Sequence, residues 1–185
     1  MANDKIEFGN LYLLRNSANN DELFFREEEN YIYFLKLMKK YLIPIADIYS
    51  FCLLPKNFAM LVYFSPDKAS RLTEGTVKPA HQYLANFFNA YAKAYNKRYK
   101  RRGSLFKEHF ARKSFDEINE LKKCIAEVHR LPLIENPQAN FEDYKFSSYR
   151  IFLSNKDTSL SRTEVLSWFG TVENFVVAHR NLNIW

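Results

Sequence analysis

The net positive charge of the chain is concentrated in one segment. Between positions 93 and 113, nine basic residues and one acidic residue give a local charge of +8, whereas the whole chain of 185 residues carries +6. The rest of the chain is therefore slightly acidic. A concentrated group of cations is what the neutralisation of nucleic-acid phosphates requires. We predict a nucleic-acid interface here, and the expected phosphate-binding residues are Lys97, Arg98, Lys100, Arg101, Arg102, Lys107, Arg112 and Lys113.

Aromatic rings interleave this basic segment at a spacing of four residues: Tyr83, Phe87, Tyr91, Tyr95 and Tyr99. On a helix with about 3.6 residues per turn, this step drifts by about 40° per repeat, so the stripe turns by roughly 160° over its length. It therefore cannot lie wholly on one face. We expect the first members to pack in the core, and Tyr95 or Tyr99 to be the candidate for stacking on unpaired bases.

The elements that must position these residues form an α+β pattern. Two β-rich runs are joined by Pro55, Lys56 and Asn57, which is typical of a hairpin. The expected order is strand 10–15, helix 27–42, strands 45–54 and 58–64, a loop at 66–75, helix 77–99, strand 104–114, a helix from an N-cap at Asp116 to 130, and short helices at 147–153, 162–169 and 172–182. We predict a ferredoxin-like antiparallel sheet with helices on one face, in a domain of residues 1–134, and a helical extension of residues 135–185 packed on it.

Composition excludes several classes of protein. Only 4 glycines are present, so no glycine-rich loop for nucleotide phosphates can be built. Hydrophobic residues make up 47% and charged residues 26% of the chain, which is typical of a folded domain. The N-terminus has no signal-peptide pattern, and no run of about 18 uncharged apolar residues exists. We expect a cytoplasmic protein whose Cys52 and Cys124 are buried free thiols.

Five stretches of the chain, taken in order, resemble one family. They are NSANNDELFFREEENYIYFL, YSFCLLPKNFAMLV, NKRYKRRGSLFKEHFARK, DYKFSSYRIFL and SRTEVLSWFG. Together they cover about residues 10–182 and resemble the HUH single-tyrosine transposases, especially the REP-associated tyrosine transposases. The resemblance implies hairpin or single-stranded DNA as the partner. It also implies a divalent metal, such as Mg²⁺ or Mn²⁺, and a tyrosine that attacks the scissile phosphate.

The sequence departs from this family at the positions that carry its chemistry. Asn57 and Ala59 stand where the resemblance implies two metal-binding histidines. Glu127 stands where it implies the nucleophilic tyrosine, and Leu131 where it implies an asparagine that assists the metal. We therefore expect a degenerate member that binds DNA, holds no metal cofactor and has lost the cleavage reaction.

Two other functions stay open. An active enzyme would need a relocated metal site, for which Glu127, His109 and His129 are the candidates, although two helical residues two apart point about 200° away from each other. A protein-interaction module would have its basic segment neutralised by acidic residues such as Glu22 and those at 27–29. The pattern fits DNA and RNA, and a monomer and a homodimer, equally well.

Overall fold

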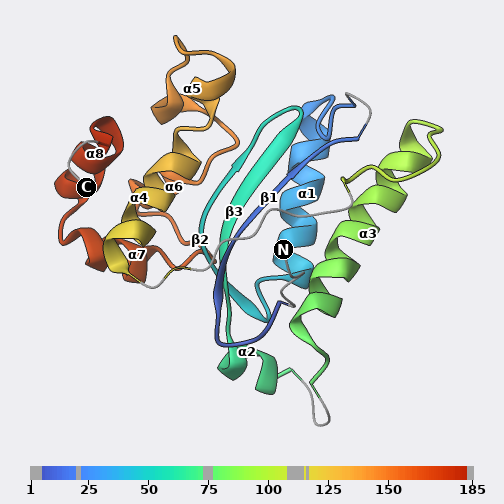
Figure 1. Ribbon diagram of the computed structural model, residues 1–185, viewed down its shortest axis with the longest axis horizontal. Coiled ribbons are helices and arrows are strands. Elements are labelled where there is room, and N and C mark those ends of the chain that lie inside the picture. The colour runs from blue at the N-terminus through green and yellow to red at the C-terminus, as the bar shows by residue number, and fades with distance from the viewer. Residues whose placement is uncertain (1–5, 20–21, 73–76, 108–114, 116, 183–185) are drawn as a thin grey trace.

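A three-stranded antiparallel sheet lies between two layers of helices (Figure 1). The computed structural model describes residues 6–19, 22–72, 77–107, 115 and 117–182. The strands are β1 (Leu11–Ser17), β2 (Ala46–Leu53) and β3 (Asn57–Phe64), in the order β1-β3-β2. The helices are α1 (Glu28–Tyr41), α2 (Pro66–Ser70), α3 (Ala80–Arg98), α4 (Ile118–His129), α5 (Pro132–Glu135), α6 (Tyr149–Phe152), α7 (Arg162–Phe169) and α8 (Val172–Arg180).

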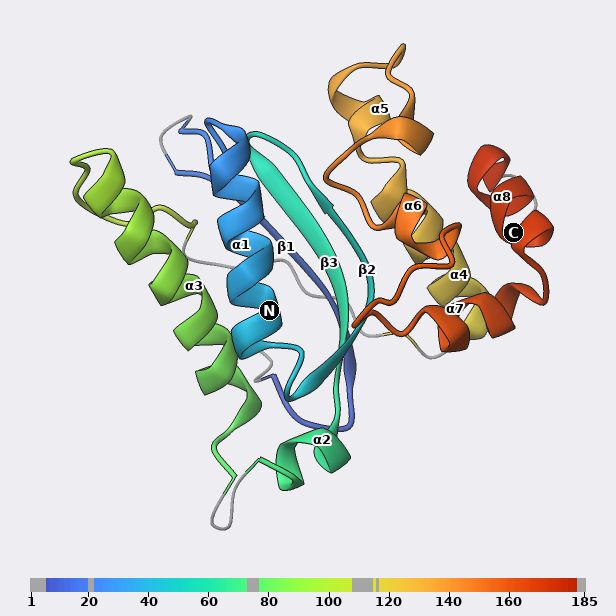
Figure 2. The same ribbon diagram turned by 180° about the vertical axis from the view of Figure 1, so that it is seen from behind.

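Helices α1 and α3 cover the first face of the sheet, as Figures 1 and 2 show from opposite sides. Aromatic side chains fill the space between them. The ring of Phe58 on β3 lies 5.4 Å from that of Phe34 on α1 and 5.7 Å from that of Phe88 on α3, measured between centroids. The early members of the aromatic stripe, Phe87 and Tyr91, are buried in this layer, as expected.

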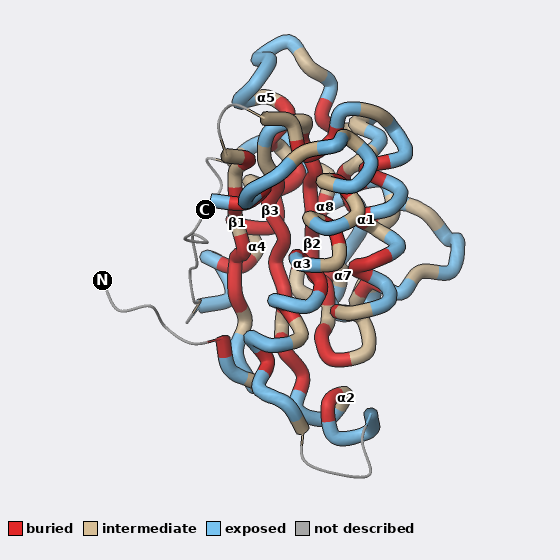
Figure 3. The backbone as a smooth tube through the Cα atoms, turned by 90° about the vertical axis from the view of Figure 1, so that its right-hand side faces the viewer, coloured by how far each residue is buried: buried red, intermediate tan, exposed pale blue. Residues whose placement is uncertain are grey.

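The second face of the sheet is covered by α4, with α7 and α8 packed beside it (Figure 2). Seven of the eight residues of β2 are buried, and β3 is almost as completely enclosed (Figure 3). Both faces of these strands are therefore in the core, which explains why their sequences are continuously apolar. The α+β class and the antiparallel sheet are confirmed, but the helices lie on both faces of the sheet and not on one.

The hairpin between β2 and β3 closes as the sequence predicts. The N–H of Leu54 donates to the carbonyl of Asn57 at 2.8 Å, and the N–H of Asn57 donates back at 3.3 Å, so Pro55 and Lys56 form the turn. Two short helices were not expected: α5 follows α4 where no helix was predicted, and α2 occupies the predicted loop at 66–75. It begins at Pro66, a residue suited to the first turn, and Ser65 Oγ accepts from the N–H of Lys68.

The predicted fourth strand differs from the described structure. Within its described part, 104–107, Phe106 makes a single bridge to Ala18, and residues 108–114 lie outside the described residues. Asp116 also lies outside them, and α4 begins at Ile118 with Glu117 at its N-cap. The division into domains at residue 134 stays a prediction, because α8 packs directly on α4 from the first part of the chain.

Both cysteines are buried thiols outside any disulfide bond, as expected. Cys52 lies on β2 and is fully enclosed, and Cys124 lies on α4, which packs against that strand. Burial raises the pKa of the Cys52 thiol well above its usual range. In the part of the chain that the structure describes, no helix is long and apolar enough to cross a bilayer.

Candidate nucleic-acid interface

The described part of the basic segment reaches one end of the molecule. The last turn of α3, the loop after it, the β2–β3 turn and α5 all lie at the upper end in Figure 1, with α3 on one side of the sheet and α5 on the other. Helix α3 ends with Lys100 in the left-handed conformation (φ 50°), which lets the N–H of Arg101 donate to the carbonyl of Asn96 at 2.8 Å. The chain then returns to the sheet, where the N–H of Asn19 donates to the carbonyl of Leu105 at 3.0 Å.

The predicted cations fall into two groups. Lys97, Lys100, Arg102 and Lys107 are exposed, and none of them contacts an acidic side chain of the described residues. Arg98, in contrast, donates through Nε to Glu27 at 2.7 Å. Arg101 is the other described cation of the predicted set that contacts an acidic side chain. Arg112 and Lys113 lie outside the described residues.

Arg101 holds the loop together. Its side chain is only 12% exposed and its Nε donates to Glu22 at 3.2 Å. Its terminal nitrogens donate to Asn96 Oδ1 and to the carbonyls of Gly103 and Ser104. With this many acceptors inside the protein, the guanidinium of Arg101 stabilises the loop and is not available to bind phosphate. Part of the acidic neutralisation that an interaction module requires is thus present, at Glu22 and Glu27, but the other four cations have no acidic partner within the described parts of the chain.

The expected base-stacking rings are not free. Tyr95 is 3% exposed and its hydroxyl donates to the carbonyl of Leu23. Tyr99 is half-buried, its hydroxyl donates to Glu27 and lies 2.9 Å from Asn30 Oδ1, and the guanidinium of Arg26 lies 4.5 Å from its ring centroid.

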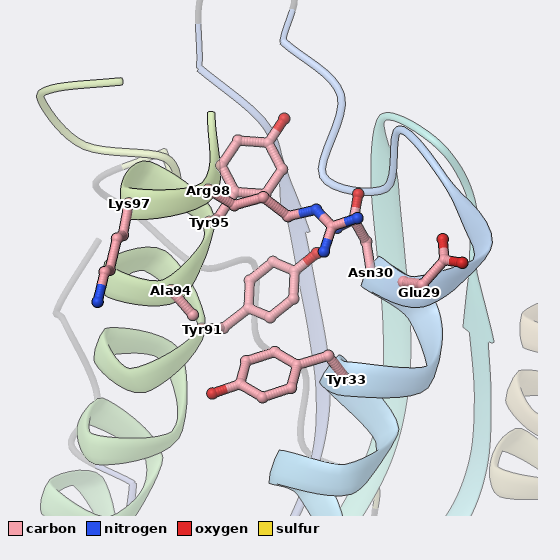
Figure 4. A pocket seen from close by; sticks show the side chains of 8 residues that line it. All are labelled: Glu29, Asn30, Tyr33, Tyr91, Ala94, Tyr95, Lys97 and Arg98. Carbon is pink, nitrogen blue, oxygen red and sulfur yellow. The ribbon is translucent and has the colours of Figure 1, made fainter. Parts of the chain in front are cut away.

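A cleft between α1 and α3 instead presents a ring that the sequence analysis missed. Its volume is about 580 Å³, and Figure 4 shows the ring of Tyr33 from α1 beside that of Tyr91 from α3. Tyr33 is 39% exposed, whereas Tyr91 is buried. In the same view Arg98 reaches across toward Asn30, and Lys97 points away from the cleft. Tyr33 lies on α1, outside the basic segment at 93–113, so nothing in the local sequence marks it as part of this end.

A second cleft, of about 300 Å³, opens where β3 begins. Because alternate residues of a strand point to the same face, Asn57 and Ala59 lie together on the side opposite Phe58. Leu131, at the end of α4, meets them there. The described residues that line this cleft are Arg15, Asn16, Ser17, Leu54, Asn57, Phe58, Ala59, Lys107, Leu131, Ile134 and Glu135.

The lining of the second cleft does not fit a divalent metal. Asn57 donates its Nδ2 to Glu135 at 3.2 Å, and Ala59 has no ligand atom. Glu135 is the one carboxylate among the described lining residues, and Arg15 and Lys107 add two positive charges. Metals of the Mg²⁺ type need several oxygen ligands, and neighbouring cations oppose their binding. Among the described residues, no three His, Cys, Asp or Glu side chains come together to hold an ion.

The candidates for a relocated metal site do not converge. Glu127 is not among the described residues that line the cleft, and His109 lies outside the described residues. His129 is fully buried, and both of its ring nitrogens are in use, at 2.7 Å from His179 Nε2 and 2.7 Å from Ser148 Oγ. His129 is therefore a hydrogen-bonded core residue.

The carbonyl of Phe175 determines the direction of the hydrogen bonds that join Ser148, His129 and His179. The carbonyl of Phe175 can only accept, so Nδ1 of His179 is the donor at 2.7 Å and Nε2 of His179 is an acceptor. His129 Nδ1 then donates to His179, and Ser148 donates to His129 Nε2. Burial lowers the pKa of His129 well below its usual range and that of His179 to about 4.

No protein family matches the sequence, and no curated protein matches it. A solved structure of a REP-associated tyrosine transposase bound to a REP hairpin matches the fold with a TM-score of 0.62, over 84% of this chain and 85% of that one. The two chains share a fold. Their sequences are 10% identical, so the relationship is a distant one. The α+β fold predicted from the sequence is the one found in this transposase.

Proposed function

We propose that this chain binds hairpin or single-stranded DNA through the phosphate backbone and does not cleave it. The observation that carries the proposal is that Lys97, Lys100, Arg102 and Lys107 are exposed at one end of the molecule without carboxylate partners among the described residues. Cations that are not neutralised internally remain available to replace the counterions of a phosphate backbone. The transposase that shares this fold is itself bound to a hairpin, which supports the choice of DNA.

The salt dependence of hairpin binding tests this proposal. Lys97→Ala combined with Arg102→Ala removes two of the unpaired cations. The matched control is Lys78→Ala combined with Arg71→Ala, which removes the same two residue types from exposed positions beside α2 and the start of α3, at the opposite end of the sheet. We expect the first pair alone to reduce the slope of log affinity against log salt by about 1.4 to 1.8, since each phosphate contact contributes about 0.7 to 0.9. Equal effects of both pairs, or binding that does not respond to salt, would contradict the proposal.

The absence of cleavage is supported by the residues at the second cleft. Asn57 is engaged with Glu135, Ala59 has no ligand atom, and Glu127 is neither a phenol nor part of the cleft lining. The test is incubation with single-stranded and hairpin DNA in Mg²⁺ or Mn²⁺, followed by a denaturing gel. We expect no covalent protein–DNA adduct. An adduct that one Tyr→Phe substitution abolishes would show instead that the chain is an active enzyme with a relocated site.

A further inference from the structure

We infer that the second cleft holds one phosphodiester group of the bound nucleic acid between Arg15 and Lys107. This inference rests on the proposed function and names a site within it. The cleft lies where β1, the start of β3 and α5 meet, at the same end of the molecule as the unpaired cations of α3 and its loop (Figure 1).

Arg15 provides the first observation. It lies on β1 directly opposite Ala59 of β3, and both residues line the cleft. The Nε of Arg15 is buried and has no hydrogen-bond partner among the residues that the structure describes. A buried donor left unpaired destabilises a fold, the more so when it belongs to a charged group. An anionic oxygen in the cleft would supply the missing acceptor, and a guanidinium can offer two parallel N–H groups to one phosphate.

The small side chain opposite Arg15 explains why a group can enter. Ala59 is fully buried and extends no further than its Cβ, so the strand surface between Arg15 and the rim formed by Leu131 and Ile134 stays hollow. Ser17, two residues along the same face of β1, adds a hydroxyl to the lining. A long side chain at position 59 would fill this space.

Lys107 is brought to the cleft by Asn16. The side chain of Asn16 donates from Nδ2 to the carbonyl of Lys107 at 3.2 Å and accepts through Oδ1 from its N–H at 3.1 Å. A third bond runs from the same N–H to the carbonyl of Ser17 at 3.3 Å. The backbone of Lys107 is thus fixed at the cleft, while its ammonium group has no acidic partner among the described residues. Asn16 is a positioning residue in this arrangement.

The charges in the cleft favour a singly charged anion. Arg15 and Lys107 contribute two positive charges and Glu135 one negative charge, so the described lining carries a net charge of +1. A phosphodiester carries one negative charge and balances it. Asn57 donates to Glu135 at 3.2 Å. This hydrogen bond engages the carboxylate, which would otherwise compete with the phosphate for Arg15 and Lys107. Removing the charge of Glu135 should therefore strengthen phosphate binding.

The experiment measures hairpin affinity and thermal stability of four variants of the full chain. Arg15→Met and Lys107→Met remove the two cations, Glu135→Gln removes the opposing charge, and Arg71→Met is the control at the other end of the sheet. For Arg15→Met and for Lys107→Met we expect about tenfold weaker hairpin binding at 0.1 M salt and a smaller slope of log affinity against log salt. One phosphate contact contributes about 0.9 to this slope, which corresponds to about a tenfold change in affinity between 1 M and 0.1 M salt. Glu135→Gln should bind more tightly than the wild type, and Arg71→Met should bind like it.

The stability readout separates a binding role from a structural one. Since Arg15 Nε has no hydrogen-bond partner in the described part of the fold, Arg15→Met should melt at the same temperature as the wild type or higher. Reduced affinity together with a clearly lower melting temperature would show that Arg15 supports the fold, and would overturn the inference. A different outcome would overturn the phosphate site but leave the proposed function standing. In that outcome Arg15→Met and Lys107→Met bind the hairpin like the wild type, while the variant at Lys97 and Arg102 binds it more weakly. A wild-type chain that binds no hairpin would overturn both.

Discussion

The side chain of Asn16 and the backbone of Lys107 exchange two hydrogen bonds, at 3.2 and 3.1 Å. This pair joins β1 to a residue 91 positions further along the chain. Asn16 is 6% exposed, so the two bonds are shielded from water. Asn16→Leu should lower the free energy of unfolding by about 2 kcal/mol, since each hydrogen bond contributes about 1 kcal/mol net. Urea denaturation of the two chains measures the difference.

The same substitution tests whether Asn16 positions Lys107. In the Asn16→Leu background, Lys107→Met should have a smaller effect on hairpin affinity than in the wild type, because the ammonium group is no longer held at the cleft. A double-mutant cycle measures this coupling. Strictly additive losses would show that the two residues act independently.

Lys100 occupies a backbone position that usually belongs to glycine. Its φ of 50° lies in the left-handed region, which costs a residue with a Cβ about 1–2 kcal/mol. Lys100→Gly should therefore raise the free energy of unfolding by about 0.5–1 kcal/mol, after the larger chain entropy of glycine is subtracted. Hairpin affinity should fall at the same time, because an unpaired cation is lost. Lys100→Ala is the control: it should weaken binding equally without the gain in stability.

Arg101 and its neighbour Arg102 should respond differently to substitution. Arg101→Ala removes the bonds to Glu22, Asn96 and two loop carbonyls, and should lower the free energy of unfolding by about 2 kcal/mol or more, in line with hydrogen bonds to charged groups. Arg101→Lys should recover little of this loss, because an ammonium group cannot reproduce the planar set of N–H donors of the guanidinium. Arg102→Ala should leave stability unchanged and weaken binding. Thermal melting and hairpin titration of the three variants, run side by side, distinguish the two roles.

The buried histidines predict loss of stability in mild acid. Burial lowers the pKa of His179 from 6.5 to about 4, so the unfolded chain binds the proton more readily than the folded chain does. Stability from this residue is fully present above about pH 6.5 and is lost as the pH falls toward 4, by about 3 kcal/mol in all. His129, whose pKa is also lowered, adds to the effect in the same direction.

Urea denaturation between pH 7.5 and 4.5 measures this dependence. His179→Gln keeps an acceptor for His129 but has no titratable ring, so its stability should change less with pH over this range. Glu142, whose pKa is lowered by Arg180, loses its contribution at lower pH and does not obscure the window. Identical pH profiles of the wild type and His179→Gln would contradict the assignment.

Tyr33 should contribute to the binding of unpaired bases. Its ring is partly exposed in the cleft between α1 and α3, beside cations at the end of α3. Tyr33→Ala should weaken binding to a hairpin with a single-stranded loop by roughly tenfold, since stacking of one base contributes about 1–3 kcal/mol. Tyr33→Phe keeps the ring and should bind like the wild type. A fully paired duplex should not distinguish the variants.

Local patterns in the sequence predict most of the elements of this fold. The hairpin at Pro55 and Lys56 and the acidic start and basic end of α1 depend on neighbouring residues, and the structure confirms them. The long helix α3 is confirmed as well, although it begins at Ala80 and not at the predicted position 77. The second helical layer could not be located in this way, because the position of α4 depends on which face of the sheet remains open. The apolar runs of β2 and β3 did carry a signal for it, since strands with one solvated face alternate.

Charge density alone identifies the segment that we propose as the interface, but it does not predict the contacts of each cation. Only contacts distant in sequence show that Arg101 is held by Glu22, while Lys100 has no acidic partner among the described residues. Arg15 is a single cation in an apolar strand, and its relevance depends on lying opposite Ala59. The buried roles of His129 and His179 likewise depend on a meeting of α4 and α8 that no local pattern encodes.

The two buried cysteines can be used to measure the opening of the two layers that contain them. Cys52 belongs to the sheet and Cys124 to the helix packed on its second face, and neither thiol is accessible while these layers are joined. A thiol-alkylating reagent can therefore modify them only in molecules that have opened. The ratio of the two modification rates measures whether the sheet and the α4 layer separate together, as one cooperative unit, or one before the other.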